Sequence, residues 1–429
     1  MPDDHPRCRS CGSDSLSVFL SLGKTPLADA LVRTEAVDDP EERYPLEVAF
    51  CSECTLVQIL EEVPPDRLFG RDYLYFSSFS PQLLQHSREN AFRLVHELGL
   101  GADSLAVELA SNDGYLLRNF AERGVPVLGI EPAPEQATAA TADGIPTLRE
   151  FFTLEVAHRL RAEGRAADVI IANNVMAHVP DLNGFVAGME VLLSDNGVIS
   201  VENPYVRDLV ERCAFDTVYH EHHCYFSCGA VDRLMRRHGL FLNEVTYFPD
   251  LHGGTLRWQM SRKEGYSEAA RRHLDDEARL GLNEFAYYDG FGARVEKVRR
   301  DLLELLQKLR ADGHTIAAYG AAAKGSTLLN YVGIGADLVD FVVDRNTYKQ
   351  GLLMPGVHLP ILPPEALLEH RPDFLLLLAW NFKDEIIRQQ ADYLAGGGRM
   401  IIPVPAPRIL QDPSAGASPA HDRNREKRP

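Results

Sequence analysis

The segment Tyr219 to His223 concentrates groups that can move protons. Its imidazoles, its carboxylate and its phenol supply candidates for a general base, an orienting acid and hydrogen-bond donors to an enolate oxygen. A helix would place Tyr219, His222 and His223 on one face, whereas a strand would align Tyr219, Glu221 and His223. The spacing leaves both geometries open. In either case, so many titratable groups favour a catalytic site over a surface cluster of histidines.

His178 is a further candidate for the same site. It follows an apolar run at 168–172 that is typical of a buried strand. Ligands of open α/β sheets bind beyond the carboxyl ends of parallel strands, so we expect His178 at the rim of a sheet. Histidine clusters also bind metals. A sugar or carbonyl site is favoured here, because cysteines elsewhere in the chain already supply the ligands for a zinc ion.

Four cysteines form two C-x-x-C pairs, Cys8 with Cys11 and Cys51 with Cys54. Two such turns suit one tetrahedral zinc ion, and a shell of four thiolates leaves no open coordination position. The spacing therefore predicts a structural zinc site, in preference to a redox pair or a chance spacing. The other cysteines lack such a pair and are expected to be semi-buried thiols rather than a second metal site: Cys213, Cys224 and Cys228.

The run Val107 to Gly114 predicts a cofactor site. A short apolar strand leads into a turn closed by glycine, and Glu131 ends the next apolar run. Such a turn lets the chain approach a nucleoside closely, and the acid can accept both ribose hydroxyls. The alternative is an ordinary α/β turn in which Glu131 only caps a helix.

The composition of this turn favours S-adenosylmethionine over NAD. The dinucleotide fingerprint needs three glycines to admit a pyrophosphate, whereas Ala110, Ser111 and Asn112 occupy the turn before Gly114. S-adenosylmethionine carries no phosphate and fits better. The predicted cofactor-binding residues are Glu108, Ala110, Asn112, Gly114, Glu131 and Asn173.

A second nucleotide-binding-like turn, Gly320 to Ser326, follows the strand candidate at 315–319. Its backbone amides, with Lys324 beside them, can hold a diphosphate, and Asp344 ends the next strand where a ribose acid would lie. The alternative is a turn of small residues that only packs a helix on a sheet. We expect Lys324 and Ser326 to bind substrate.

Length and composition indicate a globular protein of two or three domains. The chain has 429 residues, 45% of them hydrophobic, and a formal net charge of −18. The negative charge would repel phosphate backbones, so nucleic acid and anionic membranes are poor partners. No run reaches the roughly 18 to 20 apolar residues of a membrane span, and no apolar signal core is seen at the N-terminus. We expect a cytoplasmic protein with reduced thiols.

Strand and helix patterns alternate from about 80 to 262 and end in a hairpin at 241–261, which predicts a doubly wound α/β sheet with an antiparallel edge. The expected regions are a zinc-binding lobe at 1–75, a cofactor-binding core at 76–265, a helical linker at 266–312, a C-terminal Rossmann-like lobe at 313–411 and a disordered tail at 412–429.

Taken together, these motifs resemble, over nearly the whole chain, the S-adenosylmethionine-dependent sugar C-methyltransferases of antibiotic deoxysugar pathways. The matching stretches are the two cysteine pairs, LGKTPLA at 22–28, ELASNDGY at 108–115, NNVMAH at 173–178, YHEH at 219–222 and GAAAKGS at 320–326. The resemblance implies a class I methyltransferase sheet flanked by a small zinc-binding lobe and a C-terminal Rossmann-like lobe.

The resemblance also implies a substrate and a mechanism. The substrate would be a nucleotide-linked, TDP-bound 4-keto-6-deoxy sugar, methylated at C3 beside the ketone. His222 would remove the C3 proton, with Tyr219, Glu221 and His178 positioning the sugar and steadying the enolate. His220 departs from the family's pattern around this motif.

The resemblance also bears on Tyr75 and on His223. Tyr75 is expected to bind substrate, although Tyr73 lies in the same stretch, and His223 is a second departure from the motif. Because His220 and His223 add imidazoles beside the expected base, the sequence leaves open which carbon is methylated. The oligomeric state is not determined, and a monomer is compatible with the sequence.

Three other functions compete with C-methylation. A sugar O-methyltransferase would use the same cofactor but attack from a hydroxyl. An NAD-dependent oxidoreductase would bind its cofactor at the C-terminal glycine turn. A non-catalytic nucleotide-sugar binder would not need the histidine-rich segment.

Overall fold

A computed structural model describes residues 6–68, 76–251 and 253–410. Tyr73, Tyr75 and the tail from 412 lie outside these residues. The contacts within the described part of the chain form two compact units. The first unit takes its residues from Met1–Ala30, Arg43–Glu211 and Thr217–Gly292. The second takes them from Leu31–Glu42, Arg212–Asp216 and Ala293–Pro429.

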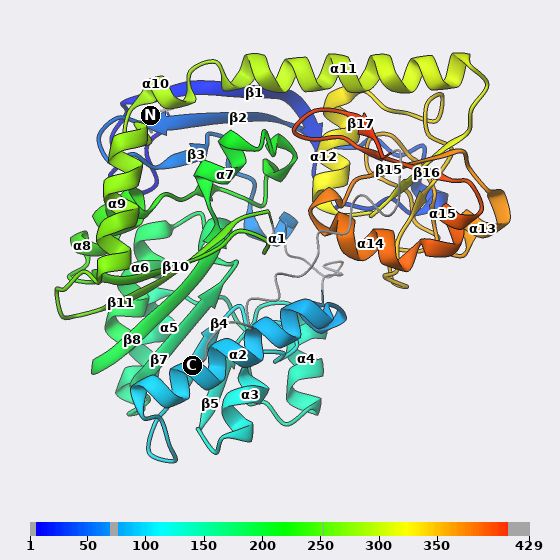
Figure 1. Cartoon of the computed structure of the whole chain (residues 1–429). Helices are drawn as coiled ribbons and strands as arrows, with labels where there is room; N and C mark the ends of the chain where they lie inside the picture. Colours follow the sequence, from blue (N-terminus) through cyan, green and yellow to red (C-terminus); the bar gives the residue numbers. More distant parts are fainter. Residues whose placement is uncertain (1–5, 69–75, 252, 411–429) are drawn as a thin grey trace, which may run out of the picture. The chain divides into compact units, whose positions relative to one another are not determined.

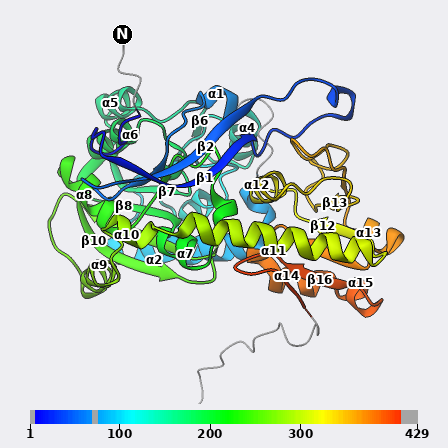
Figure 2. The same cartoon turned by 90° about the horizontal axis from the view of Figure 1, so that it is seen from above.

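A four-stranded antiparallel sheet carries the cysteine pairs. Its strands, in spatial order, are β1 (Leu16–Pro26), β2 (Arg43–Cys51), β3 (Val57–Ile59) and β9 (Cys224–Tyr225). The long strands β1 and β2 run side by side in both views (Figures 1 and 2). The fourth strand comes from a distant part of the chain and directly follows the histidine-rich segment. The sheet therefore ties that segment to the cysteine-bearing lobe.

A seven-stranded sheet forms the rest of the first unit's core. Its spatial order is β10-β11-β8-β7-β4-β5-β6, with β6, β5, β4, β7 and β8 parallel and β11 antiparallel to its neighbours. The strands are β4 (Ala106–Leu109), β5 (Val127–Ile130), β6 (Thr147–Leu148), β7 (Ala167–Asn173), β8 (Leu193–Pro204), β10 (Phe241–Phe248) and β11 (Thr255–Ser261). The predicted doubly wound sheet and its antiparallel edge are confirmed.

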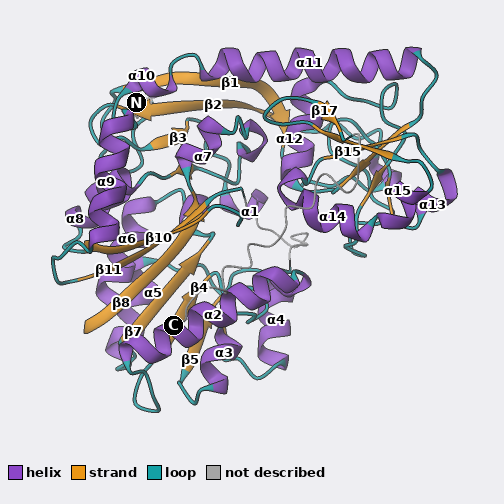
Figure 3. Ribbon diagram, in the orientation of Figure 1, coloured by secondary structure: helices purple, strands orange, loops and turns teal. Residues whose placement is uncertain are grey.

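Helices cover this sheet, and α2 lies across the strands in Figure 3. The helices of the first unit are α1 (Pro65–Leu68), α2 (Pro81–Leu98), α3 (Leu117–Glu122), α4 (Pro134–Ala142), α5 (Leu154–Ala162), α6 (Leu182–Leu192), α7 (Val206–Glu211), α8 (Cys228–Arg237), α9 (Glu268–Leu280) and α10 (Phe285–Tyr288). Leu94 of α2 and Phe120 of α3 are fully buried in one cluster with Ala106 and Val169 of the sheet. Each large side chain buried there contributes about 1.5–3 kcal/mol.

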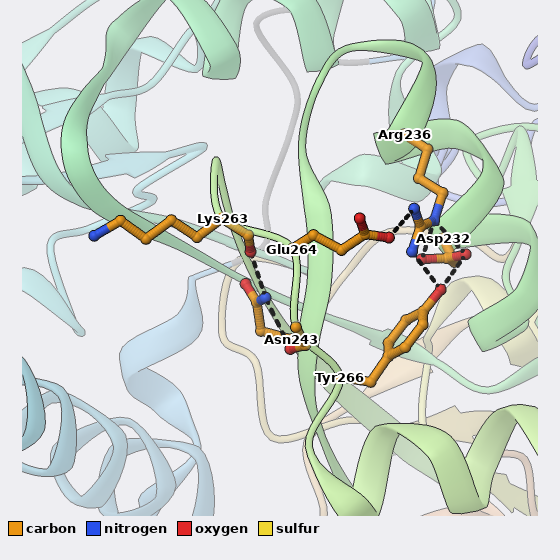
Figure 4. A network of polar contacts seen from close by, with 7 residues as sticks. Asp232, Arg236, Asn243, Lys263, Glu264 and Tyr266 are labelled. Carbon is orange, nitrogen blue, oxygen red and sulfur yellow. Dashed lines mark hydrogen bonds and ion pairs between the residues drawn. The ribbon is translucent and has the colours of Figure 1, made fainter.

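A polar network holds α8 against the connection that follows β11 (Figure 4). Arg236 donates to Asp232 at 3.0 Å and to the Tyr266 hydroxyl at 2.6 Å. The Tyr266 hydroxyl in turn donates to Asp232 at 2.9 Å. The Asn243 amide donates to the carbonyl of Lys263 at 2.8 Å. These bonds fix the chain where it leaves the sheet for α9.

The stretch expected to be helical contains α9, α10 and α11 (Phe291–Ala311), so this prediction is confirmed. Ser267 caps α9 by accepting from the amide of Ala270. Gly313 follows α11 with a φ of 85°, which lets the chain leave the helix at little steric cost. No helix in residues 6–68, 76–251 and 253–410 is long and apolar enough to cross a membrane.

The second unit is built on a six-stranded sheet of order β14-β13-β12-β15-β16-β17, parallel except at β17. Its strands are β12 (Ile316–Tyr319), β13 (Val342–Val343), β14 (Ile361–Leu362), β15 (Phe374–Leu377), β16 (Arg399–Ile402) and β17 (Arg408–Ile409). Its shorter helices are α12 (Ala323–Val332), α13 (Ala366–His370), α14 (Lys383–Gln389) and α15 (Ala391–Ala395). The β12–α12–β13 start is the predicted nucleotide-binding-like unit.

Two short segments that interrupt the first unit in the sequence, Leu31–Glu42 and Arg212–Asp216, belong to this second unit. Val32 pairs with Leu353. The carboxylate of Asp216 accepts a hydrogen bond of 2.6 Å from the Trp380 indole. Because these contacts join residues far apart in the sequence, they are not visible in its local pattern.

Candidate active site

The turn after β4 is held in an unusual backbone conformation. Ala110, Asn112 and Gly114 have φ values of 54°, 50° and 74°. A non-glycine residue in this left-handed region costs on the order of 1–3 kcal/mol and persists only where its surroundings enforce it. The amide of Asn112 donates to Glu131 at 2.8 Å, and the amide of Ala133 donates to the other carboxylate oxygen at 2.8 Å. Each oxygen keeps a lone pair for a ribose hydroxyl.

Three carboxylates gather at this turn. Burial raises the pKa of Glu108, and the neighbouring carboxylates of Glu131 and Asp113 raise it further. Glu108 Oε2 and Asp113 Oδ1 have no hydrogen-bond partner within the described residues. An acidic cluster repels a diphosphate but attracts an ammonium or sulfonium group. The residues therefore fit S-adenosylmethionine and do not fit NAD.

Sequence reasoning missed two features of this turn. The backbone amides of Ser77 and Ser78 donate to the side chains of Asn112 and Asp113 at 2.9 and 3.2 Å, so the segment before α2 docks on the turn. Gly129 of β5 leaves room for the Ser111 side chain of this turn, since a Cβ at residue 129 would lie 2.4 Å from the Ser111 hydroxyl. The glycine in the second strand was the feature of the sequence that could have indicated this close approach.

Asn173, the last predicted cofactor residue, ends β7 and pairs with Glu202 of β8. Its side-chain oxygen is buried and has no partner in the part of the chain that the structure describes. The carboxylate of Glu202 is itself occupied, because Arg257 donates to it at 2.5 Å and the His86 ring lies 2.8 Å away. The network of Glu202, Arg257 and His86 was not anticipated.

The histidine-rich segment is neither helix nor strand at its centre. A turn is closed by a 2.9 Å hydrogen bond from the His222 amide to the Tyr219 carbonyl. The turn brings the Tyr219 hydroxyl within 2.9 Å of His222 Nε2, with ring centroids 4.0 Å apart. His178 packs edge-on against His222, with ring centroids 4.7 Å apart. The structure thus brings together three of the four predicted catalytic side chains.

The hydrogen bonds of His222 fix its tautomer. Its Nδ1 lies 2.9 Å from the carbonyl oxygen of Thr217. A carbonyl can only accept, so Nδ1 carries a proton, and in the neutral form of the ring Nε2 is the acceptor nitrogen. The side chain is 8% exposed. A neutral imidazole with a defined basic nitrogen is the arrangement that a general base requires.

His178 lies in η3 (Met176–His178), just past the carboxyl end of β7. Burial lowers its pKa to about 4, and a hydrogen bond with the Glu221 backbone opposes that shift. His178 is therefore neutral at physiological pH. A neutral imidazole can donate to substrate without bringing a positive charge into the site.

The two extra imidazoles of the segment have packing roles. His220 Nε2 lies 3.0 Å from the Pro45 carbonyl, and its ring packs edge-on against Tyr44. His223 is fully buried, and burial lowers its pKa to about 3. His220 and His223 are therefore expected to be neutral and enclosed. Of the three imidazoles in the segment, His222 is the one that contacts the Tyr219 hydroxyl.

Two of the predicted substrate residues, Lys324 and Ser326, lie in the second unit. Lys324, at the start of α12, is half-buried, with its ammonium 5.3 Å from the centroid of the Trp380 ring. Burial lowers the pKa of Lys324, and the carboxylate of Asp216 opposes that shift. Ser326 is 1% exposed, and its hydroxyl has no partner within residues 6–68, 76–251 and 253–410. Asp344 accepts from the amide of Ala321 at 2.7 Å, much as Glu131 does from Asn112.

The four thiols of the predicted zinc site converge. The sulfurs of Cys8, Cys11, Cys51 and Cys54 all lie within 4.8 Å of one another. Cys8 and Cys54 are 3.4 Å apart, and Cys11 and Cys51 are 3.6 Å apart. A tetrahedral zinc with bonds of about 2.3 Å places its sulfurs about 3.8 Å apart. The geometry fits a closed structural zinc site.

The zinc lobe contacts the histidine-rich segment directly. Gln58 of β3 pairs with Cys224 of β9, and the amide of Ile59 donates to the His223 carbonyl at 3.0 Å. The Gln58 side chain also accepts from the amide of Arg9, between the first two cysteines, at 2.8 Å. Strand β2, which carries Cys51, and strand β9, which follows the turn that carries His222, therefore belong to one sheet.

Comparisons with known proteins agree with this geometry. Three family models match the chain: a zinc binding domain at residues 8–69, a methyltransferase domain at 83–245 and a C-methyltransferase C-terminal domain at 250–405. The C-methyltransferase NovU of Streptomyces niveus is 37% identical over 406 residues, which cover 94% of this chain and 96% of that protein.

Solved structures are more distant. The magnesium protoporphyrin IX methyltransferase ChlM of Synechocystis PCC 6803 with bound SAH is 11% identical, over 42% of this chain and 83% of that one, with a TM-score of 0.34. The YcgJ protein of Bacillus subtilis is 12% identical, over 42% of this chain and all of that one, with a TM-score of 0.35.

Proposed function

The chain belongs to the C-methyltransferase family that combines a zinc binding domain, a methyltransferase domain and a C-methyltransferase C-terminal domain, and from that premise we propose a substrate and a site for it. It is an S-adenosylmethionine-dependent C-methyltransferase. The proposed substrate is a nucleotide-linked 4-keto-6-deoxy sugar, carried on TDP and methylated at C3 beside the ketone.

The Tyr219–His222 pair is the observation that carries this proposal. Methylation at carbon needs a carbanion, and the carbon next to a ketone is acidic enough to yield one to a well-placed base. His222 Nε2 is basic because Nδ1 is committed to the Thr217 carbonyl. In the proposed reaction Nε2 accepts the C3 proton, while the electron pair of the C–H bond moves into the enolate and onto the carbonyl oxygen.

The remaining side chains would position the sugar and stabilise the enolate. Tyr219, whose hydroxyl contacts Nε2 in the structure, would donate to a sugar oxygen once the substrate takes its place at Nε2, and His178, which packs on the same imidazole, would donate to another. S-adenosylmethionine would supply the electrophilic methyl group that C3 takes, and it would leave as S-adenosylhomocysteine. Glu131 and the turn at 110–114 would hold its nucleoside, and Glu108 with Asp113 would face its cationic groups.

We further propose that the second unit, taken by itself, can bind a nucleotide diphosphate. Gly320 to Ala322 lead into α12, whose first amides and Lys324 offer donors to phosphate oxygens. The half-buried ammonium of Lys324 would complement the diphosphate charge. Ser326 is enclosed in the packing of α12, so its contribution would be to the shape of the turn.

The proposal is tested with the purified protein, labelled S-adenosylmethionine and a panel of nucleotide-linked 4-keto sugars. We expect label on a carbon beside the ketone, located by mass spectrometry and NMR. Solvent deuterium should enter the same carbon when the methyl donor is replaced by S-adenosylhomocysteine. A methoxy product would establish O-methylation instead, and hydride transfer to NAD would establish an oxidoreductase.

A further inference from the structure

The cysteine turn, which runs from Cys8 to Cys11, is held by a buried amide side chain that has no role in the proposed reaction. Gln58 of β3 accepts from the backbone amide of Arg9 at 2.8 Å and donates to the carbonyl of Arg7 at 3.1 Å. The side chain is 1% exposed, so both of its polar ends have exchanged water for the backbone of this turn. Gln58 therefore fixes the chain on both sides of the first cysteine.

A second amide side chain holds the same turn from α6. The Nδ2 of Asn183 donates to the carbonyls of Arg9 and Ser10 at 2.8 and 3.1 Å. Its Oδ1 lies 2.9 Å from the Nε2 of His238, and an amide oxygen can only accept, so this imidazole holds Asn183 in place. The cysteine turn is thus bonded through its backbone to two separate elements.

On the side of Gln58, the contacts continue to the turn that carries His222. Ile59, next to Gln58 in β3, donates its backbone amide to the His223 carbonyl at 3.0 Å. Gln58 itself pairs with Cys224 of β9. The strand that is bonded to the cysteine turn is therefore also the strand that holds the residue after His222.

On the side of Asn183, the contacts continue to His178. Asn183 lies in the first turn of α6, and η3, which ends at His178, shortly precedes that helix. The backbone amide of His223 donates to the carbonyl of Ala177 at 2.7 Å, which joins the two sides. The cysteine turn, β3, the histidine-rich segment and the start of α6 form a closed ring of hydrogen-bonded elements.

We infer that Gln58 and Asn183 are positioning residues for the catalytic base, which hold the His222 and His178 rings in register with the cysteine turn. The inference rests on the proposed function, because it takes His222 as the base. A zinc ion bound by the four thiolates would fix this turn, since tetrahedral coordination leaves it little freedom. The metal lobe then contributes to catalysis as well as to stability.

Proton removal from carbon explains why such a ring is useful. The base must approach the C–H bond in a near-attack geometry, and a displacement of about 1 Å can cost on the order of 10²-fold in rate. His222 lies in a turn and His178 in a short 3-10 helix, and neither element fixes its own position as a long helix would. Glu221, beside the base, is 3% exposed, so protein contacts rather than solvent surround this turn. Gln58 and Asn183 each supply such contacts at two points.

Variants of the zinc-loaded, full-length protein test the ring. Asn183→Leu and Gln58→Met keep the size of the side chain and remove its hydrogen bonds. We expect kcat for solvent deuterium exchange into the ketosugar to fall by about 10- to 100-fold. The KM for the sugar and the affinity for S-adenosylmethionine should stay within about threefold, because the lost interaction acts on the base alone.

Asn243→Leu is the matched control. The Nδ2 of Asn243 also donates to two backbone carbonyls, those of Lys263 and Gly265, at 2.8 and 3.0 Å (Figure 4). These bonds join β10 to the connection that follows β11 and do not belong to the ring. The control variant should lose a similar amount of thermal stability and keep exchange at the wild-type rate.

Imidazole NMR gives a readout that needs no substrate. In protein labelled with ¹⁵N-histidine, the Nδ1 and Nε2 signals of His222 report the two hydrogen bonds of that ring. We expect these signals to shift or broaden in Asn183→Leu and Gln58→Met and to stay unchanged in Asn243→Leu. Wild-type protein stripped of zinc should show the same change as the two ring variants under conditions in which circular dichroism shows a retained fold.

Two results would overturn the inference. One is wild-type exchange with unshifted His222 signals in the ring variants, and the other is an equal loss of exchange in Asn243→Leu, since activity would then follow stability. Because Gln58 and Asn183 reach the ring from different elements, either variant decides if the other does not fold. If the wild type acts on no ketosugar while its His222 signals respond to the variants, the proposed substrate fails and the ring stands.

Discussion

Replacing His222 with Asn should remove the base while sparing the fold. The Asn side chain can still donate to the Thr217 carbonyl, as Nδ1 does now at 2.9 Å. It offers no basic nitrogen. We therefore expect both deuterium exchange and methyl transfer to fall, with little change in the affinity for S-adenosylmethionine.

The size of the effect can be worked from the contacts. A positioned general base contributes about 10²- to 10⁴-fold, which corresponds to about 3–5 kcal/mol in the barrier. On the stability side, the Tyr219 hydroxyl loses its contact with Nε2, which costs about 0.5–1.5 kcal/mol. That loss is small against a typical stability of about 5–15 kcal/mol. The protein should fold and be nearly inactive.

The assay follows the carbon-bound proton by NMR in deuterated buffer, with binding of the methyl donor measured by calorimetry. His220→Asn is the matched control, because His220 is a neighbouring buried imidazole that also contacts a backbone carbonyl, that of Pro45. It should lose similar stability and keep exchange. Exchange at the wild-type rate in His222→Asn would refute the assignment of the base. Equal loss in both variants would show a general effect on packing.

Three further outcomes are expected. Glu131→Ala should weaken S-adenosylmethionine binding by about 10- to 150-fold, because it removes charge-assisted hydrogen bonds worth about 1.5–3 kcal/mol to the ribose; unchanged affinity by calorimetry would place the nucleoside elsewhere. Cys54→Ser should lower the zinc content, measured by elemental analysis, and the melting temperature together; full zinc occupancy in that variant would argue against the four-thiolate site. Gly129→Ala should push its new Cβ into Ser111, 2.4 Å away, destabilise the protein by about 1–3 kcal/mol and weaken donor binding; a wild-type thermal transition would show that the turn can shift.

The local signals in the sequence were reliable where chemistry depends on neighbouring residues. The two cysteine pairs predicted the zinc site, and their sulfurs converge. The apolar runs predicted the parallel strands and the position of Glu131 at the end of the second one, and the structure adds that Glu131 accepts from the amide of Asn112 in the turn after the first. In each case, the spacing along the chain sets the geometry directly, through a turn or through strand register.

The same sequence could not sort the roles within the histidine-rich segment. The sequence could be compared only with the periodicity of a helix or of a strand. The chain instead forms a turn that pairs Tyr219 with His222. That turn is held by partners from elsewhere, including the Pro45 carbonyl for His220 and the backbone of β3 for His223. Such contacts produce no periodic pattern in the sequence.

The sequence by itself determined the fold class and the four thiols that fit a zinc ion, because these depend on residue type at short spacing. Only the tertiary structure decided which nitrogen of His222 faces a carbonyl and which rings pack beside it, because Thr217 and His178 reach that imidazole through folding. Proton affinity depends on burial and on groups within a few ångströms, and these neighbours come from parts of the chain as far apart as residues 178 and 222.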